Sequence, residues 1–490
     1  MKYIIGIDQS TQGTKALVFD GEGSILYRAD VPHRQIINEL GWVSHDPEEI
    51  YRNVIRAVKT AVEGAKIPKE QIAAAGISNQ RETTVLWDQG GRPLHPAIVW
   101  QCNRAEDIAE RLKESAELVY ERSGIPLSAY FPGAKMAWLM EHGAAGLPRD
   151  TRLHFGTVDS WLLYRLTKNR IYKTDISNAS RTQLFNLRTL SWDTELCRLF
   201  GVPMEALPEA VPSDSCFGTT DFEGFLDREI PILAMLGDSH GALFGQGCHK
   251  SGMVKATYGT GSSVMMNIGE NCVRSGNGLA VSLAWGIEGR VDYVLEGNIN
   301  YTGAVITWLK EDMGLINSPG ETEKLAGQAN PADGCVLVPA FTGLSAPYWK
   351  GDAKALLCGM GRTTGRAEVV RAALDSIAFQ VTDVLKAMEQ DSGCALRELR
   401  TDGGPAKNAC LMQMQSDLAD VRVSAAEQEE LSAMGAAYLA GLTAGIYRRE
   451  ELFARMKYRQ YQPAMEEKRR EMKYAAWKKA VAMACRYAEK

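Results

Sequence analysis

Two hairpins stand out in the pattern of apolar and polar positions along the chain. Residues 3–20 contain two runs of strand-forming residues on either side of a polar centre of Ser, Thr, Gln and Gly. Residues 253–269 repeat this arrangement around a turn of small residues at 259–263. Strand formers bounded by turn residues predict β-hairpins. Helical and strand patterns alternate after each hairpin, which predicts two α/β units of similar size.

Helical periodicity is clearest in two segments. Residues 46–64 begin with Asp46 as a candidate N-cap, followed by a first-turn proline and two acids that suit the helix dipole. In residues 366–392 the apolar positions recur at steps of three and four, which predicts one buried face. The Ala/Gly-rich stretch 433–447 is shorter than the ~20 residues that a membrane span needs. We therefore expect it to be a buried helix.

The length and composition indicate a folded chain of more than one domain. Its 490 residues exceed what one hydrophobic core usually serves, and 45% hydrophobic with 23% charged residues is close to the globular average. The net charge of -5 provides no field that attracts nucleic acid or an anionic membrane, so neither is expected as a partner. The ten cysteines form no C-x-x-C pair, and the chain starts without a signal-peptide pattern, which favours a cytoplasmic protein.

The hairpin turns are candidate phosphate-binding loops. The P-loop, the dinucleotide-binding glycine motif, H-E-x-x-H and G-x-S-x-G are all absent from the sequence, so a phosphate binder would use another loop. Both turns offer hydroxyls and backbone N–H groups without bulky side chains, and Lys15 adds a cation to the first. An ordinary surface turn is the alternative for either loop alone. The residues concerned are Ser10, Thr11, Gly13 and Thr14, and Gly259, Thr260, Gly261 and Ser262.

A third candidate segment, residues 399–418, passes from a strand through Gly403 and Gly404 into a helix with Asn408 in its first turns. Two glycines at such a junction let a ligand lie against the backbone, and a helix N-terminus favours an anion or a polar ring. Tight helix packing explains a glycine pair equally well.

Two carboxylates end apolar strands beside these loops. Asp8 follows residues 4–7, and Asp238 follows residues 230–237. Mg²⁺ prefers hard oxygen ligands and a hydroxyl nucleophile needs a proton acceptor, so the pair suits a magnesium site and a general base. The alternative for Asp238 is a helix N-cap, and a lone histidine such as His240 is more often structural than catalytic.

A polyol site is suggested by Arg81 and Glu82, which follow a strand-like run and could grip vicinal hydroxyls, one donating and one accepting. Trp100 could pack against the carbon face of a polyol. Taken singly, such residues are mostly surface ion pairs and core aromatics.

Together these segments resemble the FGGY family of carbohydrate kinases, and within it most closely the glycerol kinases. The resemblance covers residues 4–447 and includes GIDQSTQGTKALVFD, GISNQRETTVLWD, YFPGAKMAWLMEH, ATYGTGSS and LRTDGGPAKNACLMQMQSD. It implies an α/β, actin/hexokinase-like (ribonuclease-H-like) duplicated two-domain fold with a central cleft. Residues 1–245 would hold the polyol site and the first phosphate hairpin. Residues 246–490 would hold the second phosphate hairpin and the adenosine site.

The resemblance also implies roles for individual residues, with ATP and Mg²⁺ as cofactors. Asp238 would be the catalytic base and Asp8 would support Mg²⁺. The substrate would be bound by Arg81, Glu82, Trp100, Tyr130, Asp238, Ser239 and Ser263. The nucleotide would be bound by Thr11, Gln12, Lys15, Thr260, Gly303, Thr307, Gly404 and Asn408.

The expected activity is ATP-dependent phosphorylation of a terminal hydroxyl of a small polyol, with glycerol first. Ser239 and Ser263 stand where glycerol kinases carry a glutamine and an aromatic residue, and Gln12, Lys15 and Thr307 also depart from their pattern. A larger pocket would favour a four- or five-carbon substrate: erythritol, threitol, erythrulose, xylulose or ribulose. A catalytically idle sugar-binding sensor and an actin-like ATPase are remoter alternatives. The family makes a homodimer or homotetramer plausible.

Overall fold

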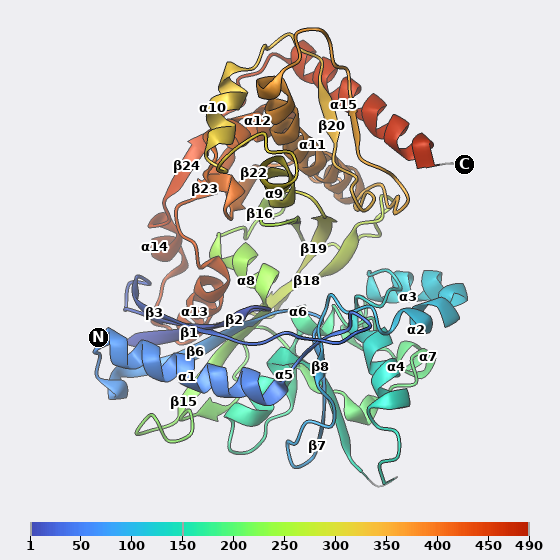
Figure 1. Cartoon of the computed structure of the whole chain (residues 1–490). Helices are drawn as coiled ribbons and strands as arrows, with labels where there is room; N and C mark the ends of the chain where they lie inside the picture. The colour runs from blue at the N-terminus through green and yellow to red at the C-terminus, as the bar shows by residue number, and fades with distance from the viewer. Residues whose placement is uncertain (1, 149–150, 489–490) are drawn as a thin grey trace.

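The chain folds around two large sheets. The computed structural model describes residues 2–148 and 151–488. Within them, a six-stranded sheet lies in the lower body of Figure 1 and a seven-stranded sheet in the upper body. The N-terminal half of the chain builds most of the lower body and the C-terminal half most of the upper one, as the colour gradient shows.

The first sheet contains the predicted N-terminal hairpin. The strands β1 and β2 pair antiparallel, while β6 lies parallel to both β1 and β15. Asp8, at the end of β1, and Asp238, directly after β15, thus lie at the same edge of the sheet, since β1 and β15 flank β6 and run in one direction. In order across the sheet, the strands are β14 (Thr219–Thr220), β15 (Ile230–Gly237), β6 (Ile72–Asn79), β1 (Tyr3–Gln9), β2 (Gly13–Phe19) and β3 (Ile25–Pro32).

The second sheet repeats this plan. Its hairpin β16–β17 is antiparallel. On the other side β16 pairs parallel with β22, and β22 pairs parallel with β23, just as β1 pairs with β6 and β6 with β15. Both predicted hairpins and the duplicated α/β pattern are confirmed. The order is β18 (Ala280–Ile287), β19 (Arg290–Ile299), β17 (Ser262–Gly269), β16 (Met253–Tyr258), β22 (Glu398–Asp402), β23 (Val423–Ala426) and β24 (Tyr458–Tyr461).

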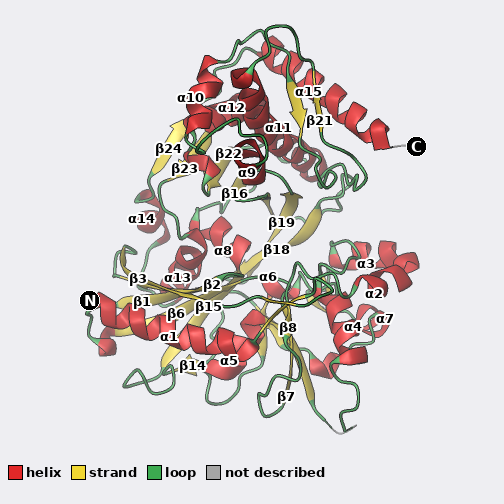
Figure 2. Ribbon diagram, in the orientation of Figure 1, coloured by secondary structure: helices red, strands yellow, loops and turns green. Residues whose placement is uncertain are grey.

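Helices cover both faces of the first sheet, and one of them comes from the far end of the chain. Figure 2 shows α1 (Pro47–Ala65) and α5 (Val158–Leu166) on one side and α8 (Asp238–Gly245) and α13 (Leu431–Thr443) on the other. Asp46 caps α1 by accepting from the Glu48 N–H, as predicted. The α13 helix is buried almost throughout, which confirms the expectation for the Ala/Gly-rich stretch.

Glycines let α13 approach α8 and the sheet closely. A Cβ atom at Gly435 would lie 1.9 Å from the carbonyl oxygen of Gly241 in α8. At Gly76, on β6, it would lie 2.1 Å from the carbonyl oxygen of Ala436. Both distances are far below van der Waals contact, so only glycine permits this packing. The contact fixes the start of α8, and with it Asp238.

The remaining elements complete the two bodies. The long helix α11 (Arg366–Ser392) matches its predicted bounds. A five-stranded sheet consists of β4 (Ile36–Ile37), β5 (Val43–His45), β8 (Ala97–Ile98), β7 (Thr84–Asp88) and β9 (Leu153–Thr157). Two-stranded pairs are β10 (Lys173–Asp175) with β13 (Glu209–Val211), β11 (Phe185–Asn186) with β12 (Ser191–Trp192), and β20 (Val336–Val338) with β21 (Leu356–Cys358). Further helices are α2 (Glu106–Arg111), α3 (Ala116–Ser123), α4 (Pro132–His142), α6 (Ile176–Ala179), α7 (Thr194–Leu199), α9 (Gly303–Glu311), α10 (Glu321–Gln328), α12 (Ala409–Ala419), α14 (Arg449–Ala454) and α15 (Glu467–Ala488).

Among the described residues, no helix has both the length and the apolar character that crossing a membrane requires.

The α8–α13 crossing generates a stability prediction. We expect Gly435→Ala to lower the melting temperature, because a methyl group would overpack the crossing at a cost of about 1–3 kcal/mol. The control is Gly327→Ala in α10, where nothing lies within 4 Å of the added methyl group. Alanine there should leave stability unchanged or raise it by up to about 1 kcal/mol. Equal melting temperatures for both variants, measured by circular dichroism, would contradict the packing argument.

Candidate active site

Two neighbouring cavities, each of about 590 Å³, share Gly259 and Thr260 of the second hairpin turn as lining residues. We call them the Asp238 cavity and the Asn408 cavity. The predicted site residues that line the Asp238 cavity are Asp8, Thr11, Arg81, Glu82, Trp100, Tyr130, Asp238, Ser239, Thr260 and Ser263. Those that line the Asn408 cavity are Thr260, Gly303, Thr307, Gly404 and Asn408.

Two predicted nucleotide-binding residues line neither cavity. Gln12 lies exposed at the tip of the first hairpin. Lys15 lies on β2, and its ammonium group forms an ion pair with Glu430 at 2.8 Å. The sequence predicts that the cation of Lys15 faces a ligand, but in the structure this ammonium group binds a carboxylate that is 415 residues away in the chain.

Asp238 is the first residue of α8, directly after β15. Its carboxylate accepts the Ser239 N–H at 2.6 Å and lies 3.3 Å from the Arg81 Nε, yet 35% of the side chain stays exposed to the cavity. The Ser239 N–H and Arg81 therefore hold the carboxylate in place, while its exposed side remains open to a ligand. This geometry suits a proton acceptor.

Asp8 is a buried carboxylate beside Asp238. Burial raises the pKa of Asp8 to about 7; Lys15 opposes the shift, whereas the Asp238 charge adds to it. A divalent cation at this position would relieve both the burial and the repulsion between the two carboxylates. Across the described residues, His, Cys, Asp and Glu nowhere gather in groups of three or more that could hold a metal ion. Mg²⁺ usually binds through one or two carboxylates together with substrate phosphates, so the pair fits a metal that arrives with a nucleotide.

Four buried charges form a ring beside the Asp238 cavity, and two of them, Arg81 and Glu82, line it. Arg81 donates to both carboxylate oxygens of Glu296, at 2.9 and 2.8 Å. Arg181 donates its Nε–H to Glu82 at 2.7 Å and forms an ion pair with Glu296 at 2.8 Å. Glu82 lies 4.0 Å from the Arg81 Nε, which closes the ring. All four side chains are 6% exposed or less.

The sequence interpretation found Arg81 and Glu82 but missed Arg181 and Glu296. Burial alone would raise the pKa of the Glu296 carboxyl, but Arg181 and Arg81 hold that pKa well below its usual range. The available signal was a glutamate within the strand-like run 290–299, where an apolar residue is expected.

Two aromatic side chains, Trp100 and Tyr130, form one wall of the Asp238 cavity. Trp100 and Tyr130 pack with ring centroids 5.6 Å apart. The Trp100 Nε1–H donates to the Thr11 hydroxyl at 2.9 Å. Thr11 belongs to the first hairpin turn, so this bond fixes a candidate phosphate loop against the candidate polyol wall.

The Asn408 cavity lies where the second hairpin meets α9. The N–H groups of Gly303 and Ala304 donate to the carbonyls of Gly259 and Thr260, at 2.9 and 3.0 Å. Asn408 caps α12 by accepting the Leu411 N–H, and it does not lie within the first turns, where the sequence interpretation put it. Its amide group donates to Thr322 at 3.0 Å. A Cβ atom at Gly404 would meet nothing within 4 Å, which leaves room for a flat ligand against this backbone.

Lys255 is a further residue that the sequence interpretation missed. It lines the Asp238 cavity with 1% of its surface exposed, and its ammonium group donates to the Thr257 hydroxyl at 3.0 Å. Among the described residues, no carboxylate lies close enough to the Lys255 ammonium group, within 4.0 Å, to form an ion pair with it. Burial lowers the pKa of this amine, with Asp402 opposing the shift. A buried cation that faces a cavity without a direct counter-ion favours an anionic ligand.

His240 is buried behind Arg81 and lines neither cavity. Burial, and secondly the Arg81 charge, lower its pKa well below the usual value, so the ring is neutral. Neither ring nitrogen has a hydrogen-bond partner within the part of the chain that the structure describes.

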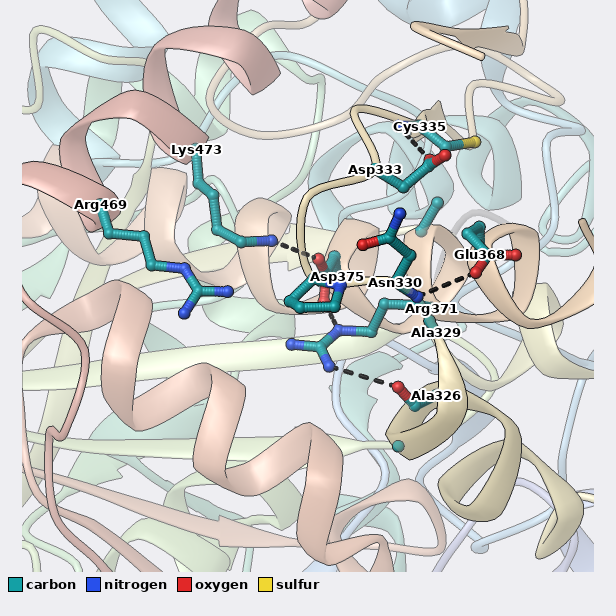
Figure 3. Close-up of a pocket in the computed structure, with 13 residues that line it drawn as sticks. Ala326, Ala329, Asn330, Asp333, Cys335, Glu368, Arg371, Asp375, Arg469 and Lys473 are labelled. Carbon is teal, nitrogen blue, oxygen red and sulfur yellow. Dashed lines mark hydrogen bonds and ion pairs between the residues drawn. The ribbon is translucent and has the colours of Figure 1, made fainter. Parts of the chain in front are cut away.

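A smaller hollow of about 240 Å³ lies away from this site, between α10, α11 and α15 (Figure 3). The Asp375 carboxylate there binds both Arg371, at 2.7 Å, and Lys473, at 3.1 Å. Asp375 thus has two cationic partners, and no predicted site residue lies among those that line the hollow.

Comparison with known proteins places the chain in a family. Residues 3–245 match the N-terminal domain of the FGGY family of carbohydrate kinases, and residues 254–444 match its C-terminal domain. The chain belongs to this family. As an FGGY kinase it is 45% identical to glycerol kinase 1 of Thermotoga maritima over 98% of this chain and 99% of that protein. It is 44% identical to a glycerol kinase of Caldanaerobacter subterraneus over 100% and 99%.

Solved structures of FGGY kinases share the fold. A crystal structure of Plasmodium falciparum glycerol kinase with ADP superposes with a TM-score of 0.93, at 34% identity and with 99% and 98% of the two chains covered. A ligand-bound xylulose kinase from Lactobacillus acidophilus, 21% identical over 100% and 98%, has a TM-score of 0.87 and shows the fold alone. The predicted two-domain actin/hexokinase-like class and the predicted kinase activity are confirmed.

The position of Lys255 generates a prediction. We expect Lys255→Met to reduce kcat/KM for the nucleotide at least about tenfold, because a buried charge-assisted contact to phosphate is worth roughly 1.5–3 kcal/mol. The melting temperature should stay the same or rise, because the variant removes an uncompensated buried charge.

Lys250→Met, a change in the loop before β16, is the matched control and should match the wild type in both measurements. A lower melting temperature with unchanged kinetics for Lys255→Met would show that Lys255 is purely structural.

Proposed function

We propose that this kinase transfers the γ-phosphoryl group of ATP to a terminal hydroxyl of a small polyol, with glycerol as the first substrate. The observation that carries the proposal is the open face of the Asp238 carboxylate, which lies 3.3 Å from Arg81 in a cavity bordered by both hydroxyl-rich hairpin turns. The names of the relatives at 44–45% identity support glycerol in particular.

The residues divide the reaction between them. Asp238 accepts the proton of the terminal hydroxyl as its oxygen bonds to the γ-phosphorus and the bond to the β-phosphate oxygen breaks, which releases ADP. Arg81 and Glu82 hold the neighbouring hydroxyls, and Trp100 covers the carbon chain. Placing the two reactants side by side provides much of the rate enhancement.

The nucleotide would extend from the Asp238 cavity into the Asn408 cavity. The turn at Thr260 belongs to both and would hold the phosphates, with Lys255 facing them. Gly404 and Asn408 would border the adenosine. Mg²⁺, bound through Asp8 and the phosphate oxygens, would supply neutralisation of the phosphate charge.

The base assignment is testable with Asp238→Asn. We expect kcat to fall by roughly 10²–10⁴-fold, the usual contribution of a general base, while the protein remains folded. The measurement is coupled ADP release with Mg-ATP and glycerol, together with circular dichroism. Asp107→Asn, an exposed change on α2, is the control and should match the wild type. A kcat of Asp238→Asn within tenfold of the wild-type value contradicts the assignment.

A second candidate function is phosphorylation of a four- or five-carbon polyol or ketose. Ser239 and Ser263 line the Asp238 cavity with short side chains, and the Ser263 hydroxyl is already directed to Glu296 at 3.3 Å. Small hydroxyl residues at these two places leave space beyond a three-carbon substrate.

We expect Ser263→Phe to lower kcat/KM for erythritol and threitol at least about tenfold, because loss of space for one carbon unit costs roughly 10–200-fold. Glycerol turnover should stay within threefold. Ser263→Ala, which removes the hydroxyl without adding bulk, separates the two effects. If the wild type phosphorylates glycerol but neither a longer polyol nor erythrulose, xylulose or ribulose, the wider-pocket candidate fails and the glycerol proposal stands.

Three expectations from the sequence stay predictions: a homodimer or homotetramer, a cytoplasmic location, and the remote alternative of an idle sugar-binding sensor. Measurable ADP formation with any polyol would exclude the last.

A further inference from the structure

The carboxylate that fixes the polyol-binding arginine comes from the other sheet. Arg81 follows β6 of the first sheet, whereas Glu296 lies within β19 of the second. The two residues are 215 positions apart in the chain, and their side chains form two hydrogen bonds of 2.9 and 2.8 Å. Arg81, one of the two residues predicted to bind the substrate hydroxyls, is thus oriented by a residue from the C-terminal half of the chain.

Glu296 has little capacity left for a substrate. A carboxylate offers about four acceptor sites, and the protein supplies two donors from Arg81, a third from Ser263 at 3.3 Å, and the Arg181 ion pair at 2.8 Å. Glu296 is 2% exposed and does not line the Asp238 cavity. It acts on a ligand only through the residues that it holds.

The same carboxylate holds two of the three guanidinium nitrogens of Arg81 away from the candidate base. The Arg81 Nε is already 3.3 Å from Asp238. Without Glu296, the guanidinium would have Asp238 and Glu82 as its remaining acidic neighbours and would turn toward them. Such a shift would withdraw Arg81 from the hydroxyls and block the open face of Asp238.

The position of Glu296 depends on how the two halves meet. The β18–β19 hairpin bonds to the N-terminal half at several points: the Val281 N–H donates to Gly124 at 2.8 Å, the Tyr293 hydroxyl to Leu187 at 2.8 Å, and the Ser213 N–H to Gly286 at 2.8 Å. A displacement of this hairpin would carry Glu296 away from Arg81. In Figure 1 the hairpin spans the gap between the bodies.

We infer that Glu296 is a positioning residue that sets the Arg81 guanidinium for polyol binding and so makes affinity for the polyol depend on the docking of the β18–β19 hairpin. The inference rests on the proposed function of the Asp238 cavity. A change at Glu296 should therefore weaken polyol binding and leave nucleotide binding intact, because the Asn408 cavity shares no residue with the charge ring.

The experiment compares Glu296→Gln, Glu296→Asp and the control Glu288→Gln. Glu288 lies in the turn of the same hairpin, 80% exposed, and contacts Arg449 at 3.7 Å, so its replacement makes the same chemical change outside the site. For each protein we would measure kcat, KM for glycerol, KM for ATP and the melting temperature. Glu296→Asp keeps the charge but shortens the reach by one methylene group.

We expect both Glu296 variants to raise the glycerol KM at least about tenfold, the loss that 1.4 kcal/mol represents, with the ATP KM within threefold of the wild type. Adding Arg81→Lys to Glu296→Gln should cost little more than the worse single change, because both act on one contact. Glu288→Gln should match the wild type throughout.

Three results decide the matter. An unchanged glycerol KM in a folded Glu296→Gln protein overturns the inference, as does an equal rise of both KM values. If Glu296→Gln does not fold, Glu296→Asp decides by the same criteria. A wild type that phosphorylates no polyol at all overturns the proposed function instead, so the two failures are distinguishable.

Discussion

The site depends on four charges that are removed from water together. Arg81, Glu82, Arg181 and Glu296 alternate in sign around a closed ring, and each is nearly completely buried. Loss of any one partner from such an arrangement leaves an uncompensated charge in a region of low dielectric, which costs several kcal/mol. The four side chains therefore hold one another in place. That rigidity suits a pocket that must recognise hydroxyl groups by direction as well as by distance.

The two halves contribute different parts to one cleft. The first sheet places both carboxylates at the ends of β1 and β15, on either side of β6, and the second sheet supplies a glycine-rich turn that borders both cavities. The Trp100–Thr11 hydrogen bond joins the polyol wall to the first turn, and the Arg81–Glu296 pair joins the first half of the chain to the second sheet. Neither half alone lines the Asp238 cavity.

Local patterns predicted the parts of this protein that local chemistry determines. Both hairpins, the capped helix at Asp46 and the acids at the strand ends follow from period-two alternation, turn residues and capping preferences within a few positions of one another. The ion pairs of Arg181 and Glu296 could not be found that way, since their partners lie 99 and 215 residues distant. The ion pair of Lys15 could not be found for the same reason: its hairpin is local, but its partner Glu430 directly precedes α13.

The packing of α13 on the first sheet has a consequence for biosynthesis. The last long strand of that sheet ends at Gly237, and the helix that covers its inner face begins at Leu431, so the ribosome makes about 190 further residues in between. At about 5–20 residues per second this interval lasts roughly 10–40 s. During that time the apolar face formed by Ile4, Leu17, Ala74 and Leu236 lacks its final cover. Until α13 is made, this exposed apolar surface makes the nascent chain prone to aggregation.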